Sequence, residues 1–179
     1  MKRIAFIVTA VIALSASLAF GSTTTFLIEA VSERNITPDT VQALIKAGAD
    51  VKAHDKSGNT ALIMAAKYSS PQIVKLLIDA GSDVNAANVL GDTALLGAAD
   101  HNNNPEVIEL LISVGADVNA HNKDGVTALM KAAKSRDNAY VVNALLQAGA
   151  DIYAEDKDGK TALSYAEGNM RTLIINAVN

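Results

Sequence analysis

The chain has 179 residues, of which half are hydrophobic, with a formal net charge of -4 and no cysteine. This composition excludes an intrinsically disordered chain, because such chains combine low hydrophobicity with high net charge. It also excludes disulfide bonds and a cysteine nucleophile. Aromatic residues make up only 4% of the chain. The small and aliphatic residues that replace them favour short helices in close contact.

The first 19 residues have the layout of a secretory signal peptide. Residues 1–3 form a charged start, residues 4–14 form an apolar run, and small residues close it at 15–19. We expect cleavage after Ala19, with Gly21 as the second choice. The alternative is an uncleaved membrane anchor, for which the apolar run is short. The sequence therefore predicts a periplasmic or secreted protein without stable membrane insertion after cleavage.

The charge of the expected mature chain bears on its partners. Removal of residues 1–19 leaves 13 basic residues against 19 acidic ones, a balance of -6. Binding to nucleic acid depends on clustered lysine and arginine side chains that neutralise phosphates. A nucleic acid is therefore not the expected partner.

One unit of about 33 residues recurs along the rest of the chain. A T-x-L motif begins at Thr25, Thr60, Thr93, Thr127 and Thr161. Two sets of glycines keep the same spacing, namely Gly48, Gly81, Gly115 and Gly149, and then Gly58, Gly91, Gly125 and Gly159. Three markers with one period predict a repeat protein.

The segment from 55 to 84 shows how each unit is expected to fold. It begins with a turn, and a short helix then opens at Thr60, whose hydroxyl can cap the first amides. A second helix opens at Pro71, a position where the missing N–H costs nothing. Gly81 ends that helix in the left-handed conformation. Asp83 then follows, and aspartate in such a loop commonly accepts hydrogen bonds from turn amides.

These motifs resemble the ankyrin repeat. The chain carries D-x-x-G-x-T-A-L-x-x-A-A followed by V-x-x-L-L-x-x-x-G-A-D-V-N-A. The resemblance implies an all-α solenoid of about five stacked helix-turn-helix repeats with projecting turns. We expect a single domain over residues 20–179, with repeats at approximately 22–54, 55–87, 88–121, 122–155 and 156–179. The family's T-P-L-H motif is TALI, TALL, TALM and TALS here. The glycine that usually ends the first helix is replaced by Ser69, by Asn102 or Asn103, and by Arg136 or Asp137.

No motif in the sequence carries an enzymatic site. The chain lacks H-E-x-x-H, a phosphate-binding G-x-x-x-x-G-K and G-x-G-x-x-G. His54 and His121 occupy one repeat position two repeats apart, which is too far for one metal ion. His101 with His121 is less clearly excluded as a haem or metal pair. We expect no enzyme activity, no cofactor and no metal.

The resemblance also implies a binding face. In similar proteins, partners lie against the turn tips and the inner surface of the first helices. The corresponding positions here, our predicted partner contacts, are Lys56, Asn59, Tyr68, Val89, Leu90, Asp92, His101, His121, Lys123 and Val126. Val89 and Leu90 are aliphatic where the sister turns are polar, so they either form an interaction hot spot or pack locally. Gly97 either relieves crowding against Met64 and Lys131 or leaves a dent for a partner.

The leading functional hypothesis is a monomeric module that binds another protein in the periplasm. What the resemblance implies most directly is an accessory or scaffold factor for a periplasmic enzyme, with catalase-type oxidative-stress defence as one example. A second hypothesis is an immunity protein that neutralises a toxin. A third, from a different class, is a haem or metal carrier.

Overall fold

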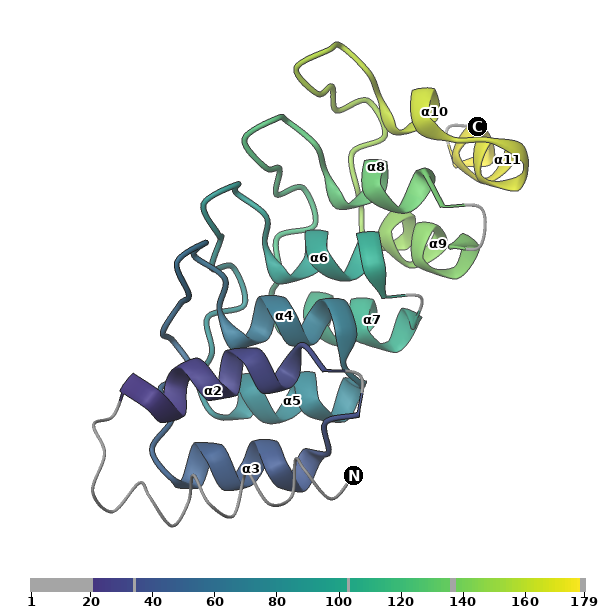
Figure 1. The fold of residues 1–179 in the computed structure, drawn as a ribbon. Helices are drawn as coiled ribbons and strands as arrows, with labels where there is room; N and C mark the ends of the chain where they lie inside the picture. The colour runs from purple at the N-terminus through teal and green to yellow at the C-terminus, as the bar shows by residue number, and fades with distance from the viewer. Residues whose placement is uncertain (1–20, 34, 103, 136–137, 178–179) are drawn as a thin grey trace.

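The computed structural model describes residues 21–33, 35–102, 104–135 and 138–177 (Figure 1). Within these ranges the chain forms ten helices and no β-strand. None of the helices described there is both long and apolar enough to cross a membrane. The predicted signal peptide lies outside the described residues, as do Arg136 and Asp137.

The helices stack in two layers that climb together along the molecule (Figure 1). The helices next to the turns, called inner helices here, are α2 (Gly21–Val31), α4 (Ala61–Tyr68), α6 (Ala94–His101), α8 (Ala128–Ala133) and α10 (Ala162–Tyr165). The outer helices are α3 (Pro38–Lys46), α5 (Pro71–Asp79), α7 (Pro105–Ser113), α9 (Ala139–Gln147) and α11 (Gly168–Asn176). The turns project together to one side (Figure 1). The predicted all-α repeat solenoid is confirmed.

The predicted threonine caps are found in the three central repeats. Thr60, Thr93 and Thr127 each accept a hydrogen bond from the amide three residues later, at 3.3 to 3.4 Å. At Thr161 the arrangement differs, because its amide donates to the Ser164 hydroxyl at 3.2 Å. The prediction for Thr25 is wrong. Thr25 lies inside α2, because the helix continues upstream to Gly21 where the sister repeats have a glycine turn.

The prolines and glycines occupy the positions that the repeat pattern predicts. Pro38, Pro71 and Pro105 are the first residues of α3, α5 and α7. The glycines that follow the outer helices have φ between 85° and 93°, in the left-handed region. The aspartates of the next loop, Asp50, Asp83, Asp117 and Asp151, accept the amide N–H two residues later at 2.8 to 2.9 Å.

A hydrophobic core runs through the described part of the stack, between the two layers. The alanine pairs of the inner helices are buried and let these helices approach closely, and they are Ala65 with Ala66, Ala98 with Ala99, and Ala132 with Ala133. Leucine and isoleucine side chains fill the space toward the outer helices. Helices of six to nine residues are unstable alone. Burial against neighbouring repeats, at roughly 1.5 to 3 kcal/mol per large apolar side chain, stabilises them.

Successive turn tips are joined by backbone hydrogen bonds. The amide of Val89 donates to the carbonyl of Ser57, that of Lys123 to Leu90, and that of Lys157 to Asp124, each at 2.9 Å. We call this series the tip ladder. It fixes the backbone of each tip against the next.

In the loops that follow the outer helices, asparagine side chains bridge neighbouring repeats. Asn85 donates to the carbonyl of Gly115 at 3.0 Å and accepts from the amide of Asp117 at 2.9 Å. Asn119 repeats both bonds with Gly149 and Asp151, at 3.4 and 2.8 Å. We call each of these an asparagine clamp. Lys52 stands at the equivalent position of the first repeat.

The residues that replace the glycine at the end of the inner helices also connect repeats. Ser69 donates its hydroxyl hydrogen to the carbonyl of Val31 at 2.8 Å, and Asn102 donates to the carbonyl of Ala66 at 2.9 Å. These carbonyls lie in the last turn of the preceding inner helix, where backbone acceptors lack a helical partner. The substitutions therefore satisfy carbonyl groups of the neighbouring repeat.

Candidate partner-binding face

The predicted contact residues lie on the turn tips and the inner helices, which together we call the inner face. Seven of the ten are exposed, namely Lys56, Tyr68, Val89, Leu90, His101, His121 and Lys123. Asn59 and Val126 are half-buried. Asp92 is the one predicted contact that is buried. The predicted contacts themselves stay predictions.

Val89 and Leu90 hold their tip in place with main-chain groups and leave their side chains in solvent. The two residues are 52% and 60% exposed. The amide of Val89 and the carbonyl of Leu90 belong to the tip ladder, and the amide of Leu90 donates to the Asn88 side chain at 2.9 Å. The contacts that hold this tip against its neighbours are therefore made by the backbone and not by the two aliphatic side chains. Two adjacent aliphatic side chains are presented on a fixed turn.

The expected exposure of Asp92 is wrong. Its side chain is buried, with the residue only 7% exposed, and it lies 3.3 Å from the ammonium of Lys131. It also accepts a hydrogen bond from Asn122 of the next turn at 3.2 Å. A carboxylate out of water needs such partners, because its unpaired burial is costly. Asp92 thus holds two repeats together.

Tyr68 and His101 form an aromatic pair on the inner face. Their ring centroids are 5.8 Å apart and the ring planes meet at 67°, an edge-to-face arrangement. Tyr68 is the last residue of α4, and His101 is the last residue of α6. The Nδ1 atom of His101 also lies 3.6 Å from a carboxylate oxygen of Asp100. Sequence reasoning selected both aromatic residues without predicting that they touch.

Gly97 is crowded by a residue that the sequence did not identify as its neighbour. A Cβ atom at this position would lie 2.9 Å from both the Cγ and the Cε of Lys67. The lysine stem therefore lies across the glycine. The predicted crowding against Met64 and Lys131 is wrong, since the atoms nearest to position 97 all belong to Lys67. The dent in the helix is filled by this chain itself.

The contact between Lys67 and Gly97 belongs to a regular diagonal pattern. The residue seven positions after the cap threonine touches the residue four positions after the threonine of the next repeat. Asp100 lies 3.2 Å from the ammonium of Lys131 in the same relation. Lys134 places its ammonium 4.4 Å from the ring centre of Tyr165, a cation–π contact. The same two repeat positions thus meet between three pairs of neighbouring repeats, once by close packing, once as an ion pair and once as a cation–π contact.

His54 and His121 have equivalent local surroundings. Each imidazole Nδ1 lies 3.2 Å from the carbonyl oxygen of the following residue. Each residue also forms an isolated antiparallel bridge with the cap threonine six positions later. Over the ranges that the structure describes, no three histidine, aspartate or glutamate residues converge to hold a metal ion.

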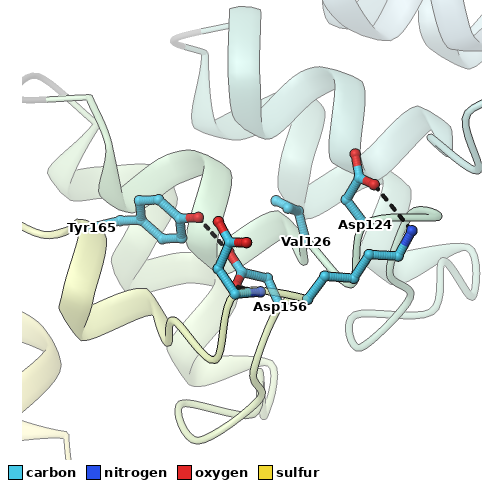
Figure 2. A pocket seen from close by; sticks show the side chains of 6 residues that line it. Asp124, Val126, Asp156 and Tyr165 are labelled. Atoms are coloured by element: carbon cyan, nitrogen blue, oxygen red, sulfur yellow. Dashed lines mark hydrogen bonds and ion pairs between the residues drawn. The ribbon is translucent and has the colours of Figure 1, made fainter.

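A pocket of about 290 Å³ lies between the last two turns, and sequence reasoning missed it. Its lining includes Val126, Asp156 and Tyr165 (Figure 2). In earlier turns the asparagine at the position of Asp156 donates to the residue at the position of Val126. Asp156 and Val126 cannot form that bond, because a carboxylate does not donate and a valine side chain does not accept. The hydroxyl of Tyr165 donates to the Asp156 carboxylate instead.

This hydrogen bond perturbs both partners. It lowers the pKa of Asp156, with help from the Lys160 amide, because it favours the charged carboxylate. It raises the pKa of Tyr165 to about 12, because the proton is held against an anion. The available signal was that Tyr165 stands at the repeat position of Met64 and Lys131. Its partner across the turn could not be inferred from that register.

A stack of short helix pairs with fixed projecting turns and an exposed inner face defines the class of helical repeat proteins. The residues of this chain place it more narrowly. The family model described as ankyrin repeats (3 copies) matches residues 27–122 and 95–177, and the chain belongs to that family. Proteins of this family are generally binding modules for other proteins. A comparison with curated proteins found no match.

Proposed function

We propose that this protein binds another protein through its inner face and acts as an accessory or scaffold factor without enzymatic activity of its own. The observation that carries the proposal is the pair of exposed aliphatic side chains at Val89 and Leu90. Exposed apolar side chains that lie together are typical of an interaction hot spot. The aromatic pair of Tyr68 and His101 extends this surface along the inner helices.

The rigidity of the face favours binding. Binding costs free energy when side chains and loops must be ordered. Here the tip ladder and the Asn88 side chain already fix the backbone around Leu90. A partner would therefore meet a preformed surface, and most of the energy from burying the two aliphatic side chains would contribute to affinity.

The compartment in this proposal rests on the signal-peptide layout of residues 1–19. An exported protein that binds without catalysis suits an accessory role toward a periplasmic enzyme. An enzyme of oxidative-stress defence, catalase-type, is the example that the family resemblance suggests. N-terminal sequencing of the protein from a periplasmic fraction tests this part, and a mature start at Phe20 is the expected result.

Site-specific photo-crosslinking tests the binding face. A photoreactive residue at Leu90 is expected to capture a resident protein in the cell. The matched control is the same residue at Glu109, which is exposed on the outer helix α7. Capture of the same protein at equal yield from both positions would contradict the assignment of the inner face. A Leu90→Asp substitution combined with Tyr68→Ala should weaken binding of the captured protein.

The activity of the captured protein separates the two roles that a binding module could have. An accessory factor leaves the enzyme active or increases its activity. An immunity protein blocks the activity of a toxic enzyme, and its deletion harms cells only when that toxin is present. Complete inhibition of the captured enzyme would replace the accessory role by the immunity role.

A further inference from the structure

Lys67 differs from the other lysines of the inner helices in what surrounds its ammonium. Lys131 lies within 3.3 Å of two carboxylates, those of Asp92 and Asp100. Lys134 lies over the ring of Tyr165. Within the described ranges, no ion pair or side-chain hydrogen bond involves Lys67, and no ring lies under its ammonium. Among these inner-helix lysines of the described ranges, Lys67 is therefore the one whose charge has no partner within the chain.

The stem of Lys67 is nevertheless held in place. Its Cγ and Cε occupy the space that a side chain at position 97 would need. The equivalent positions in the other repeats carry Met64, Lys131 and Tyr165. Glycine inside a helix is destabilising relative to alanine, and α6 accepts it at a buried position. The absence of a side chain at position 97 leaves room for the stem of Lys67, which we describe as seated on Gly97.

The aromatic pair lies beside this seated lysine. Tyr68 follows Lys67 in α4, and the two residues contact α6 at His101 and Gly97, one helical turn apart. Positions four apart on a helix are neighbours, with Cβ atoms about 5 to 6 Å apart. A positive charge with an aliphatic stem thus adjoins an aromatic surface, and the exposed Val89 and Leu90 stand on the turn before α6.

We propose that Lys67, seated on Gly97, is a preset cation that binds a carboxylate side chain of the partner protein. The inference rests on the proposed function and specifies the chemistry of its partner: an acidic residue flanked by apolar residues. A polyanion such as nucleic acid would be repelled by the balance of -6 on the expected mature chain. A single carboxylate needs only the one unpaired ammonium.

Selection of random displayed peptides on the purified protein tests this proposal. We expect the enriched peptides to carry aspartate or glutamate next to an apolar residue. Lys67→Met keeps the stem and removes the charge, so it should weaken their binding by about tenfold, as for the loss of a charged hydrogen bond. Lys67→Arg should retain binding. Lys67→Glu should change the enriched peptides to ones with lysine or arginine.

Gly97→Ala gives a second and independent test. The new methyl group displaces the stem of Lys67 but leaves its charge unchanged. We expect weaker binding of the acidic peptides together with unchanged or higher thermal stability, because alanine favours the helix. Lys75→Met is the matched control. Lys75 is a solvent-exposed lysine on α5, paired with Asp79, and its loss should leave peptide binding unchanged.

The possible outcomes separate this inference from the proposed function. Peptides that compete with partner binding but lack carboxylates would overturn the role of Lys67 and leave the binding face intact. Acidic peptides that bind Lys67→Met and Gly97→Ala with the wild-type affinity would also overturn the role of Lys67 and leave the binding face intact. Both proposals would be contradicted by a selection that yields no peptide. They would also be contradicted if the peptides crosslink only to a photoreactive residue placed at Glu109 on the outer side.

Discussion

Alanine at position 91 tests how closely neighbouring turn tips approach. Gly91 has φ of +83°, and a Cβ atom there would lie 2.9 Å from the amide nitrogen of Lys123. It would also lie 3.1 Å from the Cα of Asn122. Both are backbone atoms, so neither can move aside without shifting the next tip. Gly91→Ala therefore combines an unfavourable backbone conformation with a steric clash.

The two contributions can be given magnitudes. A left-handed conformation costs a residue with a Cβ atom about 1 to 2 kcal/mol. Overpacking against fixed neighbours adds about 1 to 3 kcal/mol. We expect Gly91→Ala to lower the free energy of unfolding by about 2 to 5 kcal/mol.

Two other glycines provide controls with the backbone contribution alone. Gly115 has φ of +92° and Gly159 has φ of +72°, and nothing lies within 4 Å of a Cβ atom at either position. Gly115 follows the outer helix of a central repeat. Gly159 occupies the same turn position as Gly91, but in the last repeat. Each substitution to alanine is expected to cost about 1 to 2 kcal/mol. The effect of alanine on the unfolded chain is common to all three variants and cancels in their differences.

Urea denaturation followed by circular dichroism measures these differences. The slope of free energy against urea should be unchanged, which would show that the folded variants expose the same surface on unfolding. Equal losses for Gly91→Ala and Gly115→Ala would refute the reasoning. They would mean that the tips separate at no cost and that the tip ladder adds nothing to stability.

Three further predictions concern contacts between repeats and within the last repeat. Asn85→Ala removes one asparagine clamp and should lower the free energy of unfolding by about 1 kcal/mol, whereas Lys52→Asn should raise it by a similar amount. Lys131→Met leaves the buried Asp92 carboxylate with its Asn122 partner alone, and should destabilise the fold by about 1 to 3 kcal/mol. The tyrosinate absorbance lost in Tyr165→Phe should titrate near pH 12. Because the folded pKa of Tyr165 is raised, the stability that it contributes is complete below pH 10 and is lost as the pH rises from 10 to 12.

Each of these predictions has an outcome that contradicts it. Unfolding curves of Lys52→Asn that match wild type would show that the first two repeats are too far apart for a clamp. A stable Lys131→Met variant would mean that Asp92 finds water in place of the lysine. A titration midpoint near pH 10 would show that Tyr165 does not donate to Asp156 in solution.

Much of the fold could be predicted from the sequence because its signals are local. A cap threonine acts on an amide three residues away, and Asp83 acts on an amide two residues away. Such contacts depend on dihedral angles within one turn of chain, so residue type and spacing are sufficient to predict them. Thr25 shows the limit of this reasoning. It carries the same motif, but residues 21–24 are helical and the helix continues through it.

The candidate site could be predicted only in part. Its exposed members were selected by repeat position, and seven of ten are indeed exposed. Asp92 was not, because burial of a turn residue depends on which side chain the following repeat presents. The surroundings of Lys67 could not be predicted, because residue type and spacing do not indicate what a surface lysine touches. Its contact with Gly97 exists only once α4 lies against α6.

The sequence by itself therefore determined the period of the repeat, the threonine caps of the three central repeats, the positions of the glycine turns, and the layers that the helices form. Tertiary structure alone decided which side chains meet: the stem of Lys67 on Gly97 and Asp92 with Lys131 across repeats, and Tyr165 with Asp156 within the last repeat. The physical reason is one of distance along the chain. The first two pairs join residues 30 or more positions apart, and the third spans a turn and a helix start. Such contacts depend on how the backbone of one element is set against the next.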